Sequence, residues 1–192
     1  LALQPNLANT QVSMRQGLVG MLYVAICLLG ILAVFYPSKC KNIFRKAQNP
    51  FSQKSAVPVE IRGHHPNCQK YSPNRINVGG RAVCAACSGL LIGALVVFTG
   101  AFGYFFIGLD IAFGSIWLLV LGEVWMLLGL AQIKLAGYAK LGVNIFFVVG
   151  SFLILVETDM LGGNVFVDFY ALGVIVFMLW FRILLSDWNN KR

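Results

Sequence analysis

The sequence predicts an all-α integral membrane protein with five transmembrane helices and one sizeable loop outside the membrane. Of its 192 residues, 58% are hydrophobic and only 11% are charged, and the mean hydropathy is +0.77. This composition lies above the range of globular domains, and a soluble chain of this length could not bury so much apolar surface. The apolar runs have the length of helices and are too long for barrel strands.

Five apolar runs are candidates for spans, since a helix needs about 20 residues to cross a hydrocarbon core about 30 Å thick. They cover residues 17–36, 88–109, 111–130, 137–156 and 162–184. The first two contain no Asp, Glu, Lys or Arg, whereas the third carries Glu123 and the fifth carries Asp168. The fourth has the shortest apolar run, and we expect it to gain length at its start, with Lys140 reaching back to the interface.

The cationic residues fall almost entirely on one side of a five-span chain. One side, which has the N-terminal tail 1–16, Asp110 and the segment Glu157–Leu161, holds only Arg15. The other fourteen of the fifteen Lys and Arg residues lie in the loop 37–87, between residues 132 and 140, and in residues 182–192. The positive-inside rule therefore predicts an outer N-terminus and a cytoplasmic tail, 185–192, in a multi-pass protein of the plasma membrane. No cleavage site precedes the first span, which we interpret as a retained anchor.

The first part of the loop, "PSKCKNIFRKAQNPFSQKS", is basic with scattered aromatic residues. Such a segment is typical of contacts with anionic lipid headgroups, at about 1 kcal/mol per cation. The charges are equally consistent with a role in topology alone. The loop lacks the folded platform that nucleic-acid recognition requires, so we expect no nucleic-acid partner.

The second part of the loop contains both histidines and three of the five cysteines. Two residues separate His65 from Cys68, two separate Cys84 from Cys87, and fifteen lie between the two pairs. Ligand pairs with this spacing form a recognised zinc pattern. The stretch "RINVGGRAVC" predicts a hairpin that bends at its two glycines. It leads the second pair into the first turn of the second span, an order similar to zinc-ribbon or treble-clef arrangements.

Physical chemistry favours a metal at these residues. A loop of about fifty residues with few large aliphatic side chains cannot offset its folding entropy with a core alone. A structural zinc in a Cys3His cage contributes on the order of 10 kcal/mol to folding. Thiolates at a helix N-terminus are stabilised by exposed amides, by the helix dipole and by the nearby Arg81. His64 is an alternate ligand, and Pro66 is expected to define the turn.

Other chemistry remains open for the cysteines. Cys84 and Cys87 are also consistent with a thiol–disulfide pair or with unliganded thiols, although a cytoplasmic location argues against a structural disulfide. We expect Cys40 to be a thiol at the membrane edge and Cys27 to be a small packing residue in the first span.

The same residues resemble a family of prokaryotic polytopic membrane proteins that is known only as a domain of unknown function. That family has a short Cys/His stretch followed by Cys-x-Arg-Cys-x-Gly at the start of a membrane helix. The counterparts here are "HHPNCQKYSPNR" and "CAACSG", within residues 60–110. The resemblance implies a signature of Cys68, Cys84, Cys87 and Gly89, with Gln69 and Arg75 as supporting positions. Ala86 replaces the family's Arg, and the histidines precede Cys68 instead of following it.

Small residues line one face of the second span. Gly89 and Gly93 are four residues apart, and Gly100 and Gly103 follow. Such faces let helices approach closely. This face is expected to pack within the bundle or to dock another membrane subunit.

The acids in the spans are candidates for function. Counted from the outer side at 1.5 Å per residue, Glu123 would lie about 19 Å deep and Asp168 about 10 Å deep. A charge near mid-bilayer costs about 3 kcal/mol, so we expect Glu123 to face protein or water. No cation lies in the apolar part of a span to pair with it, so an ion path and a protonated carboxyl bonded to a neighbouring helix are both consistent. Asp110, Glu157, Asp159 and Asp168 all fall toward the outer side as a candidate cation site.

The predicted function is that of a zinc-binding polytopic membrane protein, a structural or accessory subunit of a larger membrane enzyme complex. It is not expected to be catalytic by itself. One alternative is a membrane thiol–disulfide oxidoreductase that uses Cys84 and Cys87, with a quinone between the helices. Another is an ion or metal transporter that uses Glu123 and the outer acids. No inverted repeat is evident in the sequence, which weakens the transporter hypothesis.

Overall fold

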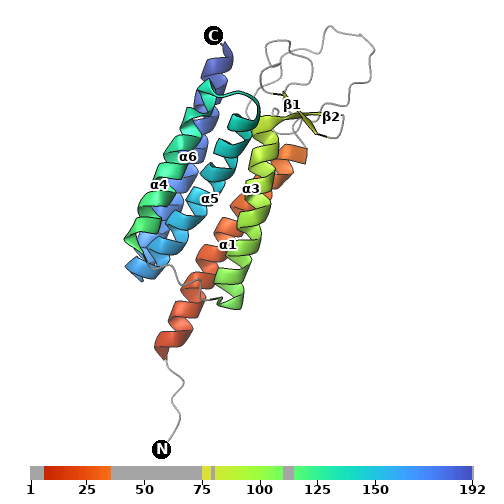
Figure 1. Ribbon diagram of the computed structural model, residues 1–192. Coiled ribbons are helices and arrows are strands. Elements are labelled where there is room, and N and C mark those ends of the chain that lie inside the picture. Colours follow the sequence, from red (N-terminus) through yellow and green to blue (C-terminus); the bar gives the residue numbers. More distant parts are fainter. Residues whose placement is uncertain (1–6, 36–74, 79–80, 110–114, 192) are drawn as a thin grey trace, which may run out of the picture.

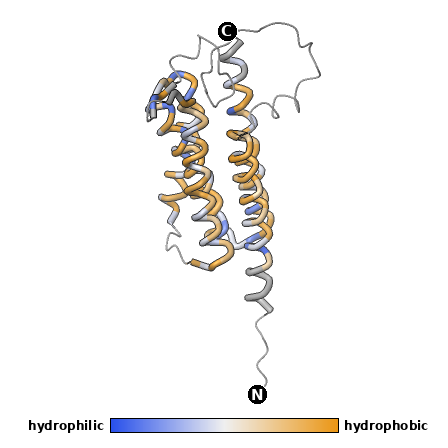
Figure 2. The backbone as a smooth tube through the Cα atoms, turned by 90° about the vertical axis from the view of Figure 1, so that its right-hand side faces the viewer, coloured by the Kyte–Doolittle hydropathy of each residue, from blue (hydrophilic) through white to orange (hydrophobic). Residues whose placement is uncertain are grey.

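The described part of the chain folds into a bundle of five α-helices with a small β-hairpin at one end (Figure 1). The computed structural model describes residues 7–35, 75–78, 81–109 and 115–191. All five helices are long enough and apolar enough to cross a membrane, and they are apolar along most of their length (Figure 2). This confirms the predicted class of a helical, multi-pass membrane protein.

The elements follow one another up and down the bundle. They are α1 (Leu7–Phe35), β1 (Arg75–Val78), β2 (Arg81–Cys84), α3 (Ala85–Phe102), the π-helix η2 (Gly103–Ile107), α4 (Ile116–Leu130), the 3-10 helix η3 (Ala131–Lys134), α5 (Gly137–Gly162) and α6 (Val165–Lys191). Successive helices run in opposite directions (Figure 1). We call the end that carries β1, β2, η3 and the C-terminus of α6 the hairpin end, and the opposite end the Arg15 end.

The described cations keep the asymmetry that the sequence predicts. Among the described residues, all Lys and Arg other than Arg15 belong to segments at the hairpin end: Arg75, Arg81, Lys134, Lys140, Arg182 and Lys191. Arg15 belongs to the first part of α1, at the other end. The side of the membrane that each end faces follows only from the positive-inside argument.

Helix α5 is the centre of the bundle and packs most extensively against α4 and α3. α1 packs mainly against α3, and α6 against α5. The larger core cluster combines residues of α1, α3, α5 and α6, including Val19, Val97, Leu155 and Ile175. A buried hydrogen bond of 2.9 Å joins the Tyr23 hydroxyl of α1 to Ser151 Oγ of α5.

Glycines allow these helices to approach closely. A Cβ added at Gly89 would meet the backbone oxygen of Leu141, and one added at Gly93 would lie 3.0 Å from Val148 Cβ, both on α5. The glycine face of the second span therefore packs within the chain, which is one of the two roles that the sequence predicts. On the other side of α5, a Cβ at Gly150 would lie 2.6 Å from the carbonyl oxygen of Gly122 in α4.

Two span boundaries differ from the prediction. The segment Glu157–Leu161, expected to be a connection on the outer side, belongs to α5. The helix continues to Gly162 and is capped by Gly163, which has a φ of 54° and donates its N–H to the Asp159 carbonyl. Its acidic residues suggested a solvated loop, but Glu157 and Asp159 find their partners in other parts of the bundle. α4 begins at Ile116, where Ser115 Oγ accepts from the Trp117 N–H, instead of at residue 111.

Candidate functional site

The hairpin predicted before the second span is present and delivers the cysteine pair to a helix start. β1 and β2 are antiparallel, with Arg75 opposite Cys84 and Val78 opposite Arg81. Cys84 ends β2 and is the N-cap residue of α3, with extended backbone angles. Because α3 begins at the next residue, Cys87 lies in its first turn. Both residues are thiols and not halves of a disulfide.

The surroundings of Cys84 favour its thiolate. A hydrogen bond with the Cys87 side chain is the largest effect that lowers the Cys84 pKa, and burial opposes it. The backbone amides of Cys87 and Ala86 and the charge of Lys140 lower it further, to about 6 from an ordinary value of 9.0. These are the effects expected of a cysteine at a helix N-terminus next to a cation. The pair therefore suits metal ligation or thiol chemistry.

Two cations approach the thiol pair from helices that are distant in sequence. The charge of Lys140, from α5, interacts with Cys84 and Cys87, and that of Arg182, from α6, interacts with Cys87. From the sequence, both residues were expected only to define topology. Their distances along the chain from the cysteines, with two or more spans between, left no local signal of this proximity.

Arg182 is buried at the hairpin end, with 6% of its surface exposed. Its Nη2 donates to Gln132 Oε1 at 2.8 Å and to Asn144 Oδ1. Its guanidinium lies 4.9 Å from the centre of the Phe147 ring, a cation–π contact. Asn144 in turn donates to the Lys140 carbonyl oxygen at 2.5 Å. This network fixes a positive charge behind the cysteine pair.

The remaining predicted ligands lie outside the described residues. These ligands are His64, His65 and Cys68. The supporting residue Gln69 and the separate thiol Cys40 also lie outside the described residues. Within the described part of the chain, no group of three or more His, Cys, Asp or Glu residues could hold a metal ion. The two described thiols nevertheless have the donor chemistry of half a Cys3His zinc cage. Of the supporting positions, Gly89 packs against α5 and Arg75 lies opposite Cys84 in the hairpin.

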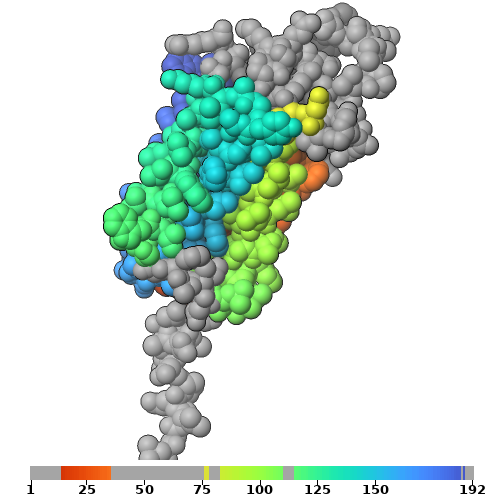
Figure 3. Space-filling view, viewed as in Figure 1, coloured from red at the N-terminus to blue at the C-terminus, as the bar shows by residue number. Residues whose placement is uncertain are grey.

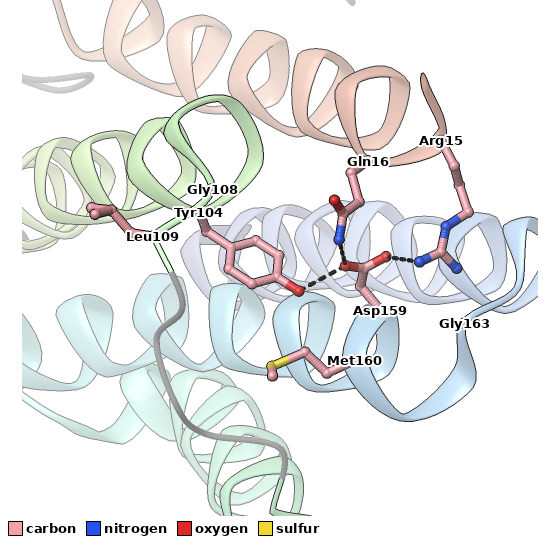
Figure 4. A pocket seen from close by; sticks show the side chains of 8 residues that line it. All are labelled: Arg15, Gln16, Tyr104, Gly108, Leu109, Asp159, Met160 and Gly163. Carbon is pink, nitrogen blue, oxygen red and sulfur yellow. Dashed lines mark hydrogen bonds and ion pairs between the residues drawn. The ribbon is translucent and has the colours of Figure 1, made fainter. Parts of the chain in front are cut away.

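A second polar site lies at the Arg15 end and surrounds Asp159 (Figure 4). Arg15 Nη2 lies 2.7 Å from Asp159 Oδ1. Asp159 Oδ2 accepts hydrogen bonds from the Tyr104 hydroxyl at 2.7 Å and from Gln16 Nε2 at 3.0 Å. These four side chains line a cavity of about 310 Å³ together with Gly108, Leu109, Met160 and Gly163. The cluster joins α1, η2 and α5.

The π-helix explains how Tyr104 reaches this cluster. Gly103, Tyr104 and Phe105 are consecutive and all buried, which the ordinary turn of an α-helix does not favour on one face. The wider turn of η2 directs both aromatic side chains into the bundle. Short π-helical turns are frequent at functional sites. Nothing in the local sequence distinguishes this turn from the rest of the apolar run.

Asp168, which belongs to a fourth element, also faces the guanidinium of Arg15. It lies on α6, is fully buried, and its Oδ2 is 3.4 Å from Arg15 Nη1. Neither oxygen accepts a hydrogen bond from a described group. One guanidinium thus faces two carboxylates. The sequence predicts Arg15 in an outer tail, whereas α1 already begins at Leu7 and brings this residue into the bundle.

The predicted group of outer acids is only partly assembled. Arg15 brings Asp159 and Asp168 together, but Glu157 is directed elsewhere, since its Oε2 accepts the Ser115 N–H at 3.0 Å before α4. Asp110 lies outside the described residues. Since Arg15 occupies the position between Asp159 and Asp168, the arrangement functions better as an ionic link between helices than as a cation site.

Glu123 does not join either cluster. It lies on α4 and is exposed on the surface of the bundle, so the expectation that it faces protein or water stays a prediction. Because α4 begins at Ile116, Glu123 lies about 11 Å along the helix axis from that end.

Comparisons with protein-family models, with curated proteins and with solved structures find no match.

Proposed function

We propose that the chain is a zinc-binding, multi-pass protein of the plasma membrane that serves as a structural or accessory subunit of a larger membrane enzyme complex. The zinc ligands are His65, Cys68, Cys84 and Cys87, with His64 as the alternate ligand. The observation that supports this proposal is the delivery of Cys84 and Cys87 by the hairpin into the first turn of α3. The loop lies on the cytoplasmic side by the positive-inside rule.

The charges around the thiol pair agree with a metal cage. Three thiolates and one neutral imidazole around Zn²⁺ carry a net negative charge, and such a charge near the membrane needs compensation. Lys140 and Arg182 interact electrostatically with the cysteines that would hold the metal. Zinc would supply folding energy to the loop, and through α3 it would attach the loop to the bundle.

The proposal is tested by the metal content of the purified full chain, measured by mass spectrometry together with thiol titration. We expect one zinc per chain, with three thiols protected until a chelator is added. C84S and C87S should each lose the metal, whereas C27S, a substitution within the α1 core, should retain it. Protein purified without chelator that contains no metal would overturn the proposal.

A second candidate, a thiol–disulfide oxidoreductase, is favoured by the pKa of about 6 for Cys84 and by its hydrogen bond with Cys87. Oxidation of the two thiols to a disulfide would release two electrons and two protons to an acceptor such as a membrane quinone. This candidate predicts a reversible Cys84–Cys87 disulfide and no tightly bound metal. Mass spectrometry of alkylated protein before and after reduction distinguishes the two. The transporter hypothesis gains no support, because Glu123 is separate from the acids held by Arg15.

A further inference from the structure

Glu123 lies on an outward face of α4 that is otherwise apolar. Ile116, Val120 and Leu127 share this face at helical spacing and are exposed, at 56%, 44% and 55%. We call these three residues and Glu123 the Glu123 face. An adjoining side of the helix, with Gly122, Met126 and Gly129, is buried. Figure 3 shows α4 along one edge of the bundle.

The position of the carboxyl makes a lipid environment unfavourable. In the span Ile116–Lys134, Glu123 lies about 11 Å from one end and about 17 Å from the other. The Glu side chain is too short to reach either interface from there. An acid inside the hydrocarbon layer costs about 3 kcal/mol and normally faces protein or water.

Two charged side chains inside other spans find partners within the chain. Arg15 pairs with Asp159, and Arg182 binds Gln132 and Asn144. Glu123 has no hydrogen bond or ion pair with any described residue. The glycine faces of α3 and α4 are already occupied by α5, so a partner subunit cannot dock there. The described residues therefore supply no partner for Glu123.

We infer that the Glu123 face docks a transmembrane helix of a partner subunit that carries Lys or Arg at the depth of Glu123. This inference rests on the proposed role as an accessory subunit and specifies its docking surface. A basic side chain is the complement of the carboxyl, and burial between two helices strengthens the pair. A second copy of the chain fits less well, because two Glu123 carboxylates would repel each other. The described residues contain no exposed cation in the middle of a span.

The test uses the full chain, purified with its metal and reconstituted in phosphatidylcholine vesicles. The probe is a labelled polyleucine transmembrane peptide with one central Lys, and its association is measured by resonance energy transfer. The same peptide with a central Leu is the reference. We expect the Lys peptide to bind about tenfold more tightly than the Leu peptide, and E123L should abolish this preference. The variant E123L/L29E carries the acid on an exposed position of α1 and should not restore it.

Three outcomes would overturn the inference. The two peptides could bind equally, or E123L/L29E could bind the Lys peptide as well as the unmodified chain does. Energy transfer between two labelled copies of the chain, lost in E123L, would identify a second copy as the occupant. Metal content is measured in the same samples. Preference for the Lys peptide in a metal-free chain would support the docking surface even though the zinc proposal had failed.

Discussion

Arg15 of α1 and Asp159 of α5 form an ion pair of 2.7 Å between side chains that are 10% and 1% exposed. The pair connects the first helix of the chain to the central one at a point where Tyr104 and Gln16 complete the hydrogen bonding of the carboxylate. α1 packs mainly against α3, so this polar contact is a specific tie between α1 and the centre of the bundle. The contribution of this ion pair to the free energy of unfolding can be measured.

Loss of the Arg15 charge is expected to destabilise the bundle more than loss of the Asp159 charge. R15Q leaves two buried carboxylates without a cation, whereas D159N leaves Arg15 with Asp168 at 3.4 Å. Removal of one partner of a buried pair costs about 3–5 kcal/mol, and we expect R15Q to approach this range. Unfolding by denaturant in detergent measures both variants, with M14A at the exposed neighbour as the control. Equal stability of R15Q and M14A would contradict the prediction.

Substitution of Asp168 should destabilise the bundle much less than substitution of Arg15, or should stabilise it. Its carboxyl is fully buried and neither oxygen accepts a hydrogen bond from a described group. D168N keeps the volume and removes a poorly compensated charge, so the free energy of unfolding should fall by less than about 1 kcal/mol or should rise. R15Q/D168N should be less destabilised than the sum of the single variants. A loss in D168N as large as that in R15Q would show that Asp168 is ionised and strongly paired.

The close contact of α4 and α5 predicts a position-specific effect of an added methyl group. In G150A the new Cβ would lie 2.6 Å from the Gly122 carbonyl oxygen, whereas at Gly142 on the same helix nothing lies within 4 Å. Overpacking of this kind costs about 1–3 kcal/mol. G142A should be neutral or slightly stabilising, because alanine favours a helix. The two variants are compared by unfolding in the same detergent, and a G150A variant as stable as G142A would show that the two backbones are farther apart.

The thiol pair predicts the pH dependence of alkylation. In chelator-treated protein, Cys84 should be mostly thiolate at pH 7, because its pKa is lowered to about 6. Its alkylation rate by iodoacetamide should therefore fall as pH decreases through 6 and change little between pH 7 and 9. C87A removes the hydrogen bond that lowers the pKa most and should shift the transition to higher pH. Peptide mass spectrometry assigns the modified cysteine, and a rate that still increases tenfold above pH 7 would contradict the prediction.

Some features of the fold could be predicted because their signals are local. Five long apolar runs predict five spans, since the cost of unpaired backbone groups in lipid allows only helices there. The two glycines between alternating residues predict the hairpin that precedes Cys84. The entry of the cysteine pair into the first helical turn follows from the same short stretch.

Other features depended on which helices lie side by side. The helical class, the asymmetry of charge and the position of the cysteine pair at a helix start follow from the order of residues along the chain. The packing of the helices was needed to show that Arg15 meets Asp159 and Asp168, that Lys140 and Arg182 approach the cysteines, and that Glu123 points out of the bundle. The physical reason is that apolar length is a property of one segment, whereas the pairing of a buried charge depends on a partner from another helix. Composition and spacing along the chain do not encode that partner.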